Sequence, residues 1–217
     1  MRRSLAVCGL AAAFLGLGTS PALAGGDDGG KGEWVPIEQL LPDYYTSFDV
    51  AACGSTVTVA PGDVRSVQVR ERTRADGTVV RDYRGGATVD LTWQSDGATI
   101  DELDISGPGR DVVSPDGSAI DVTLHGASIL YPVPGEERYF AEAGLPALAW
   151  FGRGVVTVHI TSDPDTQETT SERFDVHARV VDLCRWFDRP GAHHASAHQH
   201  GPSGRHTHAD RWEHAHG

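Results

Sequence analysis

The chain has 217 residues, of which 18 are basic and 30 are acidic, and its formal net charge is −12. A protein with this charge is repelled by nucleic acid and by anionic membrane surfaces, so we exclude both as partners. The length predicts one domain of about 155 residues with two flexible ends.

Residues 1–24 have the pattern of a secretory signal peptide. Arg2 and Arg3 form a basic start, Leu5 to Leu17 is apolar, and Ala22-Leu23-Ala24 matches an A-x-A cleavage site. The apolar run is shorter than the about 20 residues that a membrane-spanning helix needs. We therefore expect a secreted protein without membrane insertion.

Removal of the signal peptide also removes Cys8 and leaves Cys53 and Cys184. An even number of cysteines in an oxidising compartment predicts a disulfide, here Cys53–Cys184. We divide the chain into the signal peptide at 1–24, a linker and N-terminal extension at 25–52, a β domain at 53–186, and a tail at 187–217.

The extension begins with the glycine-rich linker Gly25–Gly32, and one helical turn is expected at Ile37–Leu41, between two prolines. From Ser55 onward, apolar and polar residues alternate between turn signals such as Asp76-Gly77, which is typical of antiparallel strands. A Pro/Gly-rich loop interrupts this pattern from Pro132 to Pro146. The expected strands are Thr56–Val59, Val64–Thr73, Val79–Arg84, Ala87–Gln94, Thr99–Ser106, Asp111–Ser114, Ala119–Tyr131, Leu148–Phe151, Val155–Thr161 and Thr169–Leu183.

These elements predict an all-β fold, an antiparallel meander of about eight or nine strands that forms a small barrel or a two-sheet sandwich. No long helix is expected. In the last strand, Phe174, Val176, Ala178 and Val180 share one parity and should point inward. Asp175, His177 and Arg179 share the other parity and should face water.

Several turn motifs also support a resemblance. The motifs are Ile105–Arg110, Ser114–Ser118 and Gly152-Arg153-Gly154, framed by Cys53-Gly54 and Val181–Cys184. Over Cys53–Cys184 the chain resembles a group of uncharacterised secreted actinobacterial all-β proteins. The abundance of Arg, the single Lys and the lack of Asn fit a high-GC bacterium. No activity is known for the group, so the resemblance implies no catalytic residues.

Most enzyme classes lack their residues in this chain. If the two cysteines pair, no thiol is left as a nucleophile, and the domain has no lysine for Schiff-base chemistry. G-x-S-x-G, Walker, dinucleotide-binding and H-E-x-x-H motifs are absent from the sequence. We therefore predict neither catalytic nor cofactor-binding residues.

Four weaker signals have structural interpretations that we favour. Asp101, Glu102 and Asp104 could supply paired carboxylates to a hydrolase, although a solvated sheet face with a bulge at Glu102-Leu103 explains them more simply. Asp163-Pro164-Asp165 fits a hairpin turn better than a calcium loop. The histidines His125, His159 and His177 fall on the polar face of their strands. The rings of Trp93, Trp150 and Tyr131 are candidates to line an apolar ligand cavity if the fold is a barrel.

The C-terminal tail contains eight of the eleven histidines of the chain. Three H-x-H pairs begin eight residues apart, at His198, His206 and His214. In an extended chain, residues i and i+2 project to the same side, so each pair can present two imidazoles to one ion. We expect the tail to be disordered without metal, and it is the candidate site for zinc, copper or nickel. The candidate metal ligands are His193, His194, His198, His200, His206, His208, His214 and His216.

We conclude that the sequence favours a secreted non-enzymatic β-domain protein of unknown partner, with transition-metal binding at the tail and no required cofactor. Two alternatives stay open: a carrier of a small apolar ligand, and a secreted hydrolase that uses the carboxylates near Glu102.

Overall fold

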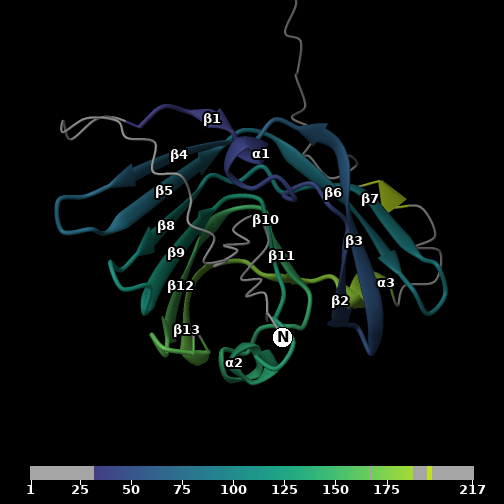
Figure 1. The fold of residues 1–217 in the computed structure, drawn as a ribbon. Coiled ribbons are helices and arrows are strands. Elements are labelled where there is room, and N and C mark those ends of the chain that lie inside the picture. The colour runs from purple at the N-terminus through teal and green to yellow at the C-terminus, as the bar shows by residue number, and fades with distance from the viewer. Residues whose placement is uncertain (1–31, 167, 188–194, 197–217) are drawn as a thin grey trace, which may run out of the picture.

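The computed structural model describes residues 32–166, 168–187 and 195–196, and in these the chain forms three β-sheets and three short helices (Figure 1). The seven-stranded sheet consists of β1 (Val35–Pro36), β4 (Gln68–Thr73), β5 (Val79–Arg84), β8 (Gly109–Val113), β9 (Ala119–His125), β12 (Gly154–Ser162) and β13 (Thr169–Ala178). The five-stranded sheet consists of β2 (Phe48–Ala52), β3 (Ser55–Arg65), β6 (Ala87–Trp93), β7 (Thr99–Asp104) and β15 (Ala195–Ser196). The three-stranded sheet consists of β10 (Ser128–Leu130), β11 (Ala149–Phe151) and β14 (Val181–Asp182). The helices are α1 (Ile37–Leu40), α2 (Glu137–Glu142) and α3 (Cys184–Phe187).

The all-β, antiparallel fold is confirmed, and the sandwich is the arrangement that fits. In the described residues the sheets remain open, with β1 and β13 at the edges of one and β15 and β2 at the edges of another. The strand order departs from a simple meander, because β5 pairs with β8 while the β6–β7 hairpin joins the other large sheet. Every pairing is antiparallel except that of β15 with β7.

Two hydrophobic clusters fill the space between the sheets. One lies between the five-stranded sheet and the β4–β5 end of the seven-stranded sheet, and it includes Ile37 and Leu91. The second lies between β8, β9 and β12 on one side and β10, β11 and α2 on the other, and it includes Phe151. Phe174, Val176, Ala178 and Val180 pack against the second cluster, as their parity predicted.

Two of the expected strands each form two shorter strands, because the chain turns at points that the alternation of apolar and polar residues does not reveal. The stretch Ala119–Tyr131 forms two strands in different sheets, because Gly126 has a φ of 69° and turns the chain between β9 and β10. The stretch Thr169–Leu183 likewise divides into β13 and β14. Helix α2 lies in the region expected to be only a loop, where Phe140 packs against Phe174 with 4.9 Å between ring centroids.

The Asp-Gly turns form as their composition predicted. In three of them the aspartate carboxylate accepts a hydrogen bond from the backbone N–H two residues later, and the following glycine has a positive φ. These aspartates are Asp76, Asp96 and Asp116. Asp163 accepts a hydrogen bond from the backbone N–H of Asp165 in the same way, and its own N–H donates to the carbonyl of Glu168, so the predicted hairpin turn is present.

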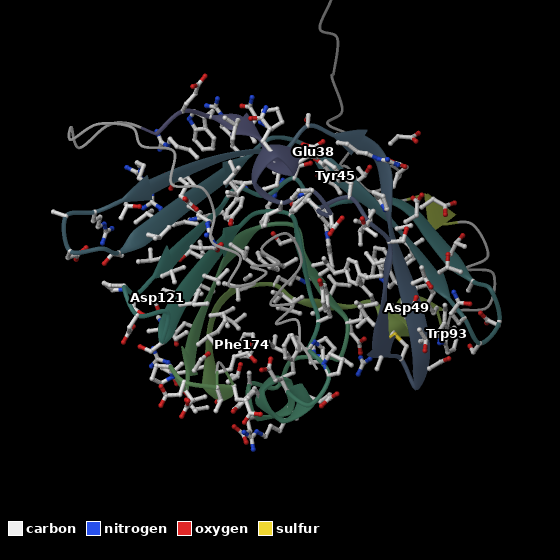
Figure 2. The ribbon with its side chains drawn as sticks, in the orientation of Figure 1. Glu38, Tyr45, Asp49, Trp93, Asp121 and Phe174 are labelled. Atoms are coloured by element: carbon white, nitrogen blue, oxygen red, sulfur yellow. A yellow bond between two sulfur atoms is a disulfide. The ribbon has the colours of Figure 1, made fainter. Side chains whose placement is uncertain are left out.

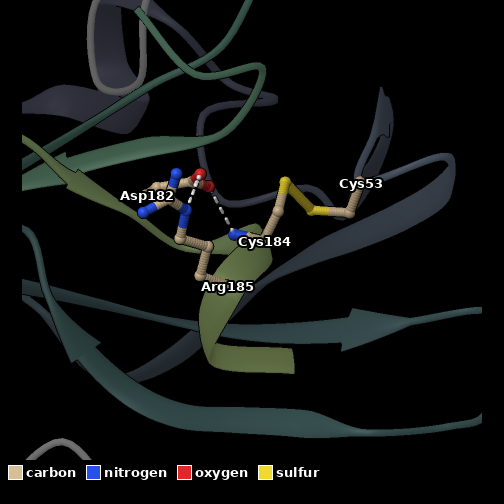
Figure 3. Close-up of a disulfide and its surroundings, with 4 residues drawn as sticks. All are labelled: Cys53, Asp182, Cys184 and Arg185. Carbon is tan, nitrogen blue, oxygen red and sulfur yellow. Dashed lines mark hydrogen bonds and ion pairs between the residues drawn. A yellow bond between two sulfur atoms is a disulfide. The ribbon is translucent and has the colours of Figure 1, made fainter. Parts of the chain in front are cut away.

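The predicted disulfide is present, with a Cα–Cα distance of 5.0 Å between Cys53 and Cys184 (Figure 3). Cys53 and Gly54 form the two-residue turn between β2 and β3, and both have positive φ, as a hairpin turn of this length requires. On the other side, the carboxylate of Asp182 accepts a hydrogen bond from the backbone N–H of Cys184 and pairs with Arg185. The disulfide therefore joins the first hairpin of the five-stranded sheet to α3.

The residues before the disulfide are part of the folded structure. Pro36 pairs with Gln68, and the backbone N–H of Ile37 donates to the carbonyl of Val67. The side chain of Ile37 is fully buried. The helical turn expected between the two prolines is α1, and it positions the segment that follows it against the five-stranded sheet.

Candidate functional site

An apolar pocket of about 70 Å³ lies where the segment after α1 crosses the ends of β3, β6 and β10. Its lining is aromatic and aliphatic and comes from stretches that are far apart in the chain. The lining residues are Tyr44, Tyr45, Thr46, Phe48, Val59, Ala60, Pro61, Ala87, Thr88, Val89, Ile105, Ile129 and Tyr131.

Two successive turns after Pro42 hold the tyrosines at this pocket. The backbone N–H of Tyr44 donates to the carbonyl of Leu41, and the backbone N–H of Thr46 donates to that of Asp43. The rings of Tyr44 and Tyr45 meet edge to face, with centroids 4.9 Å apart. The Tyr45 hydroxyl accepts a hydrogen bond from the backbone N–H of Val67, which fixes its ring beneath α1 (Figure 2).

Phe48 and Tyr131 form the mouth of the pocket. Their ring centroids are 5.4 Å apart, and Phe48 is 40% exposed. Among the described residues, only Phe48 and Val64 are large hydrophobic residues that are exposed to this degree. Of these two residues, Phe48 lines the pocket, so apolar surface is exposed to solvent beside it.

Tyr44, one of the residues that line the pocket, has a hydroxyl group that is not engaged by the described residues. It is buried and has no hydrogen-bond partner there. Burial, with the nearby Tyr45, Tyr131 and Asp111, raises the pKa of Tyr44 well above its usual value. The phenol therefore stays protonated and keeps a hydrogen bond to donate.

A buried carboxylate lies within electrostatic reach of Tyr44. Asp111, on the inner face of β8, is 1% exposed, and its Oδ2 accepts a 2.6 Å hydrogen bond from the Tyr83 hydroxyl, whereas its Oδ1 has no partner in the described residues. Burial raises the pKa of Asp111 to about 6, against the lowering effects of the Tyr83 hydrogen bond and of Arg81. The Arg81 guanidinium donates a hydrogen bond to the Glu71 carboxylate, so its charge acts on both Glu71 and Asp111.

Two of the carboxylates considered for hydrolysis make hydrogen bonds within the fold. Glu102 accepts hydrogen bonds from the Thr88 hydroxyl and from the backbone N–H of Asp63, and so holds β3 against β6 and β7. Asp104 accepts a hydrogen bond from the backbone N–H of Ser106. The predicted bulge is confirmed, since Glu102 has a φ of 54° and the β6–β7 register shifts beside it.

Of the three rings proposed to line a cavity, only Tyr131 lines the pocket. Trp93 packs against Phe187, with 5.8 Å between centroids. The Trp150 indole N–H donates to the backbone carbonyl of Asp104. Both tryptophans thus take part in packing between elements, because the barrel in which all three would face one cavity does not form.

The three domain histidines lie on the polar face, as predicted. His125 and His177 are exposed. The ring of His159 lies between the carboxylates of Asp121, at 2.7 Å, and Asp175, at 3.1 Å. In the described part of the chain, no group of three or more His, Cys, Asp or Glu residues is placed to hold a metal ion.

Several predictions concern residues outside the described ranges. These are the signal peptide at 1–24 and all eight tail histidines, from His193 to His216.

In the described residues, no helix has the length and apolar character needed to cross a membrane.

Comparisons of the chain with protein-family models, curated proteins and solved structures found no match. The resemblance over Cys53–Cys184 therefore stays a prediction, and the case for a function rests on the geometry.

The sequence did not point to Tyr44, Tyr45 or Phe48. These residues lie in a stretch without helical or strand periodicity, and only the two prolines before them indicated a turn. The buried pair of Asp111 and Tyr83 was also missed. Val112 and Val113 follow Asp111 directly, so this short strand lacks the alternation that would show which way Asp111 faces.

Proposed function

We propose that this chain is a secreted, non-enzymatic binding protein whose β domain takes up a small apolar group in the pocket between Tyr44 and Phe48. The observation that carries the proposal is the combination of an open aromatic pocket with a buried hydroxyl that has no partner in the described residues. Ligand sites are commonly apolar cavities with a few placed polar groups. The preferred ligand is thus a ring or branched chain with a hydrogen-bond acceptor for Tyr44.

The size of the pocket limits the ligand. A volume of about 70 Å³ has room for about five water molecules, judged from the space one water needs. Pockets that enclose whole ligands are larger, at about 300–1,000 Å³. We therefore expect a single ring-sized group to enter, with the rest of the ligand outside the mouth at Phe48.

The contacts of the carboxylates support a binding role over a hydrolytic one. The Glu102 carboxylate accepts hydrogen bonds from the Thr88 hydroxyl and from the backbone N–H of Asp63. Removal of this carboxylate should therefore weaken the attachment of β3 to β6 and β7. Any effect on a bound molecule should follow from that change.

The proposal is tested by nuclear magnetic resonance titration of the isotope-labelled protein with two small probes. Acetophenone has a ring and a carbonyl acceptor, whereas ethylbenzene has the ring alone. We expect acetophenone to bind more tightly and both probes to shift the amide signals of the segment from Tyr44 to Phe48. Phe48→Ala should weaken both, and Val64→Ala, at the other exposed apolar residue, should weaken neither. Equal binding to the two variants would contradict the proposal.

We also propose that the histidine tail binds transition metal ions, on the basis of the regular eight-residue spacing of its H-x-H pairs. Calorimetric titration of zinc, copper and nickel compares the mature protein with a form that ends at Pro190. The proposal predicts a fixed stoichiometry that is lost on truncation and on acidification to pH 5, because protonated imidazole does not bind metal. Weak binding of all three metals that persists at pH 5 would contradict it.

A further inference from the structure

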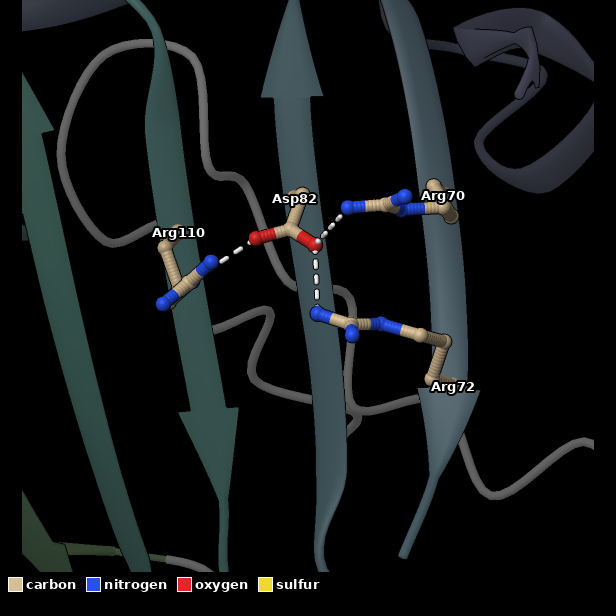
Figure 4. A network of polar contacts seen from close by, with 4 residues as sticks. All are labelled: Arg70, Arg72, Asp82 and Arg110. Carbon is tan, nitrogen blue, oxygen red and sulfur yellow. Dashed lines mark hydrogen bonds and ion pairs between the residues drawn. The ribbon is translucent and has the colours of Figure 1, made fainter. Parts of the chain in front are cut away.

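Three arginines on the outer face of the seven-stranded sheet converge on one carboxylate (Figure 4). Arg70 and Arg72 on β4 reach Asp82 on β5 at 2.9 and 2.7 Å, and Arg110 on β8 reaches it at 2.7 Å. The register accounts for this arrangement, because Asp82 lies opposite Arg70 on one side and opposite Arg110 on the other.

A fourth arginine extends this group. Arg84 follows Asp82 by two residues, so it lies on the same face of β5. Its guanidinium lies 4.1 Å from the centroid of the Trp34 ring, and that of Arg70 lies 4.7 Å from the same ring. Trp34 thus holds two of the four cations in place. We call Arg70, Arg72, Arg84 and Arg110 the arginine cluster.

The cluster presents positive charge to solvent. The Asp82 side chain is 9% exposed, whereas those of Arg72 and Arg110 are 35% and 54% exposed. Each guanidinium carries five N–H donors, and Asp82 receives one from each of its three partners, so most of these donors remain unused by it. Four cations around one anion leave a local excess of positive charge in a chain whose net charge is −12.

Fold stability accounts for only part of this arrangement. The buried Asp82 links β4, β5 and β8 through its three ion pairs, but like charges on neighbouring positions of a sheet repel one another. A bound anion would relieve that repulsion. Planar guanidinium groups bind sulfate, phosphate and carboxylate oxygens through two parallel hydrogen bonds.

We propose that the arginine cluster binds an anionic polysaccharide through its sulfate or phosphate ester groups. The backbone positions of the cluster follow the spacing of the sheet, with neighbouring strands about 4.8 Å apart and alternate residues of one strand about 7 Å apart. A polymer that carries several ester groups can therefore contact more than one of these arginines at once. Several simultaneous contacts raise the affinity far above that of a single ion.

Other partners fit this face less well. A single-stranded nucleic acid also stacks its bases on aromatic rings, and the Trp34 ring at this face already contacts the guanidiniums of Arg70 and Arg84. A peptide cannot join the sheet as an added strand at β5 or β8, because each of these strands is paired on both sides.

The test is calorimetric titration of the mature protein with dextran sulfate at several salt concentrations, with uncharged dextran as the reference polymer. The variants are Arg72→Gln, Arg110→Gln and their combination. Arg173→Gln is the matched control, because Arg173 lies on the same face, on β13, and is 69% exposed. We expect at least a tenfold loss of affinity in the double variant and less than a twofold change in the control. The dependence of log K on log salt should fall by about one for each arginine removed that contacts the polymer.

Two further measurements sharpen the test. Asp82→Asn, provided that its thermal melting shows a folded protein, should bind dextran sulfate more tightly because it removes the carboxylate that, among the described residues, the cluster holds. Polyglutamate should bind more weakly than dextran sulfate. The proposal is overturned if Arg173→Gln loses as much affinity as the double variant, if polyglutamate binds as tightly, or if inorganic phosphate alone binds as well as the polymer.

Discussion

Replacement of Asp111 by asparagine should remove a defined part of the pH dependence of stability. Burial raises the folded-state pKa of Asp111 to about 6, from the usual 3.8 of an aspartate, so the native protein holds this proton more tightly than the unfolded chain does. The contribution of the protonated group to stability is then fully present below the unfolded pKa and is lost as the pH rises through about 6. A difference of about two pKa units corresponds to about 3 kcal/mol, and about 2 kcal/mol of it falls between pH 4 and pH 8.

The assay is urea unfolding, followed by tryptophan fluorescence, of the wild type and Asp111→Asn at pH 4, 6 and 8. We expect the free energy of unfolding of the wild type, relative to the variant, to fall by about 2 kcal/mol across this range. Any constant cost of the asparagine amide cancels in this comparison. Asp116→Asn is the contrasting variant. Hydrogen bonds from Ser114 and Ser118 lower the pKa of Asp116 to about 2, so its contribution is lost only at lower pH, and the difference from the wild type should be flat above pH 5. A flat difference for Asp111→Asn would refute the reasoning, because it would mean that Tyr83 and Arg81 cancel the effect of burial.

Three further predictions concern single features of the structure. Tyr44→Phe should stabilise the free protein by about 1 kcal/mol, because it removes a buried donor without a described partner, and it should abolish any preference for acetophenone over ethylbenzene; a loss of stability on urea unfolding would contradict this. Replacement of both Cys53 and Cys184 by serine should cost up to about 5 kcal/mol for a 131-residue separation, and an unchanged melting temperature would contradict the constraint assigned to the disulfide. Gly62→Ala should lower the melting temperature, because a Cβ there would lie closest to the Thr88 hydroxyl and 2.8 Å from a Glu102 carboxylate oxygen; a smaller effect in a Thr88→Ala background would support the first contact, and an equal effect would contradict it.

Strand positions could be predicted from the sequence where two signals coincide. The strand Val79–Arg84 was predicted with its observed bounds, because an Asp-Gly turn precedes it and two glycines follow it. The bulge at Glu102 was also predictable, since Ile100 and Leu103 are both apolar and buried although they have opposite parity. Alternation shows which residues of a strand share a face, and turn residues show where a strand stops.

The strand order could not be predicted in this way, because alternation does not identify the neighbour of a strand. The hairpin of β6 and β7 lies in one sheet and that of β8 and β9 in the other, although both have the same pattern of short strands and tight turns. The pocket was missed for a related reason. Tyr44, Phe48 and Tyr131 meet only because α1 and the two large sheets bring distant segments together. A prediction of these contacts needs the topology first.

The most direct measurement for the binding role is the set of intermolecular nuclear Overhauser effects between acetophenone and the isotope-labelled mature protein. The account predicts contacts from the ring protons of the probe to the side chains of Tyr44, Phe48 and Tyr131, with the acetyl group nearest Tyr44. Contacts confined to other parts of the surface, or a probe that binds without any contact to these three rings, would contradict it.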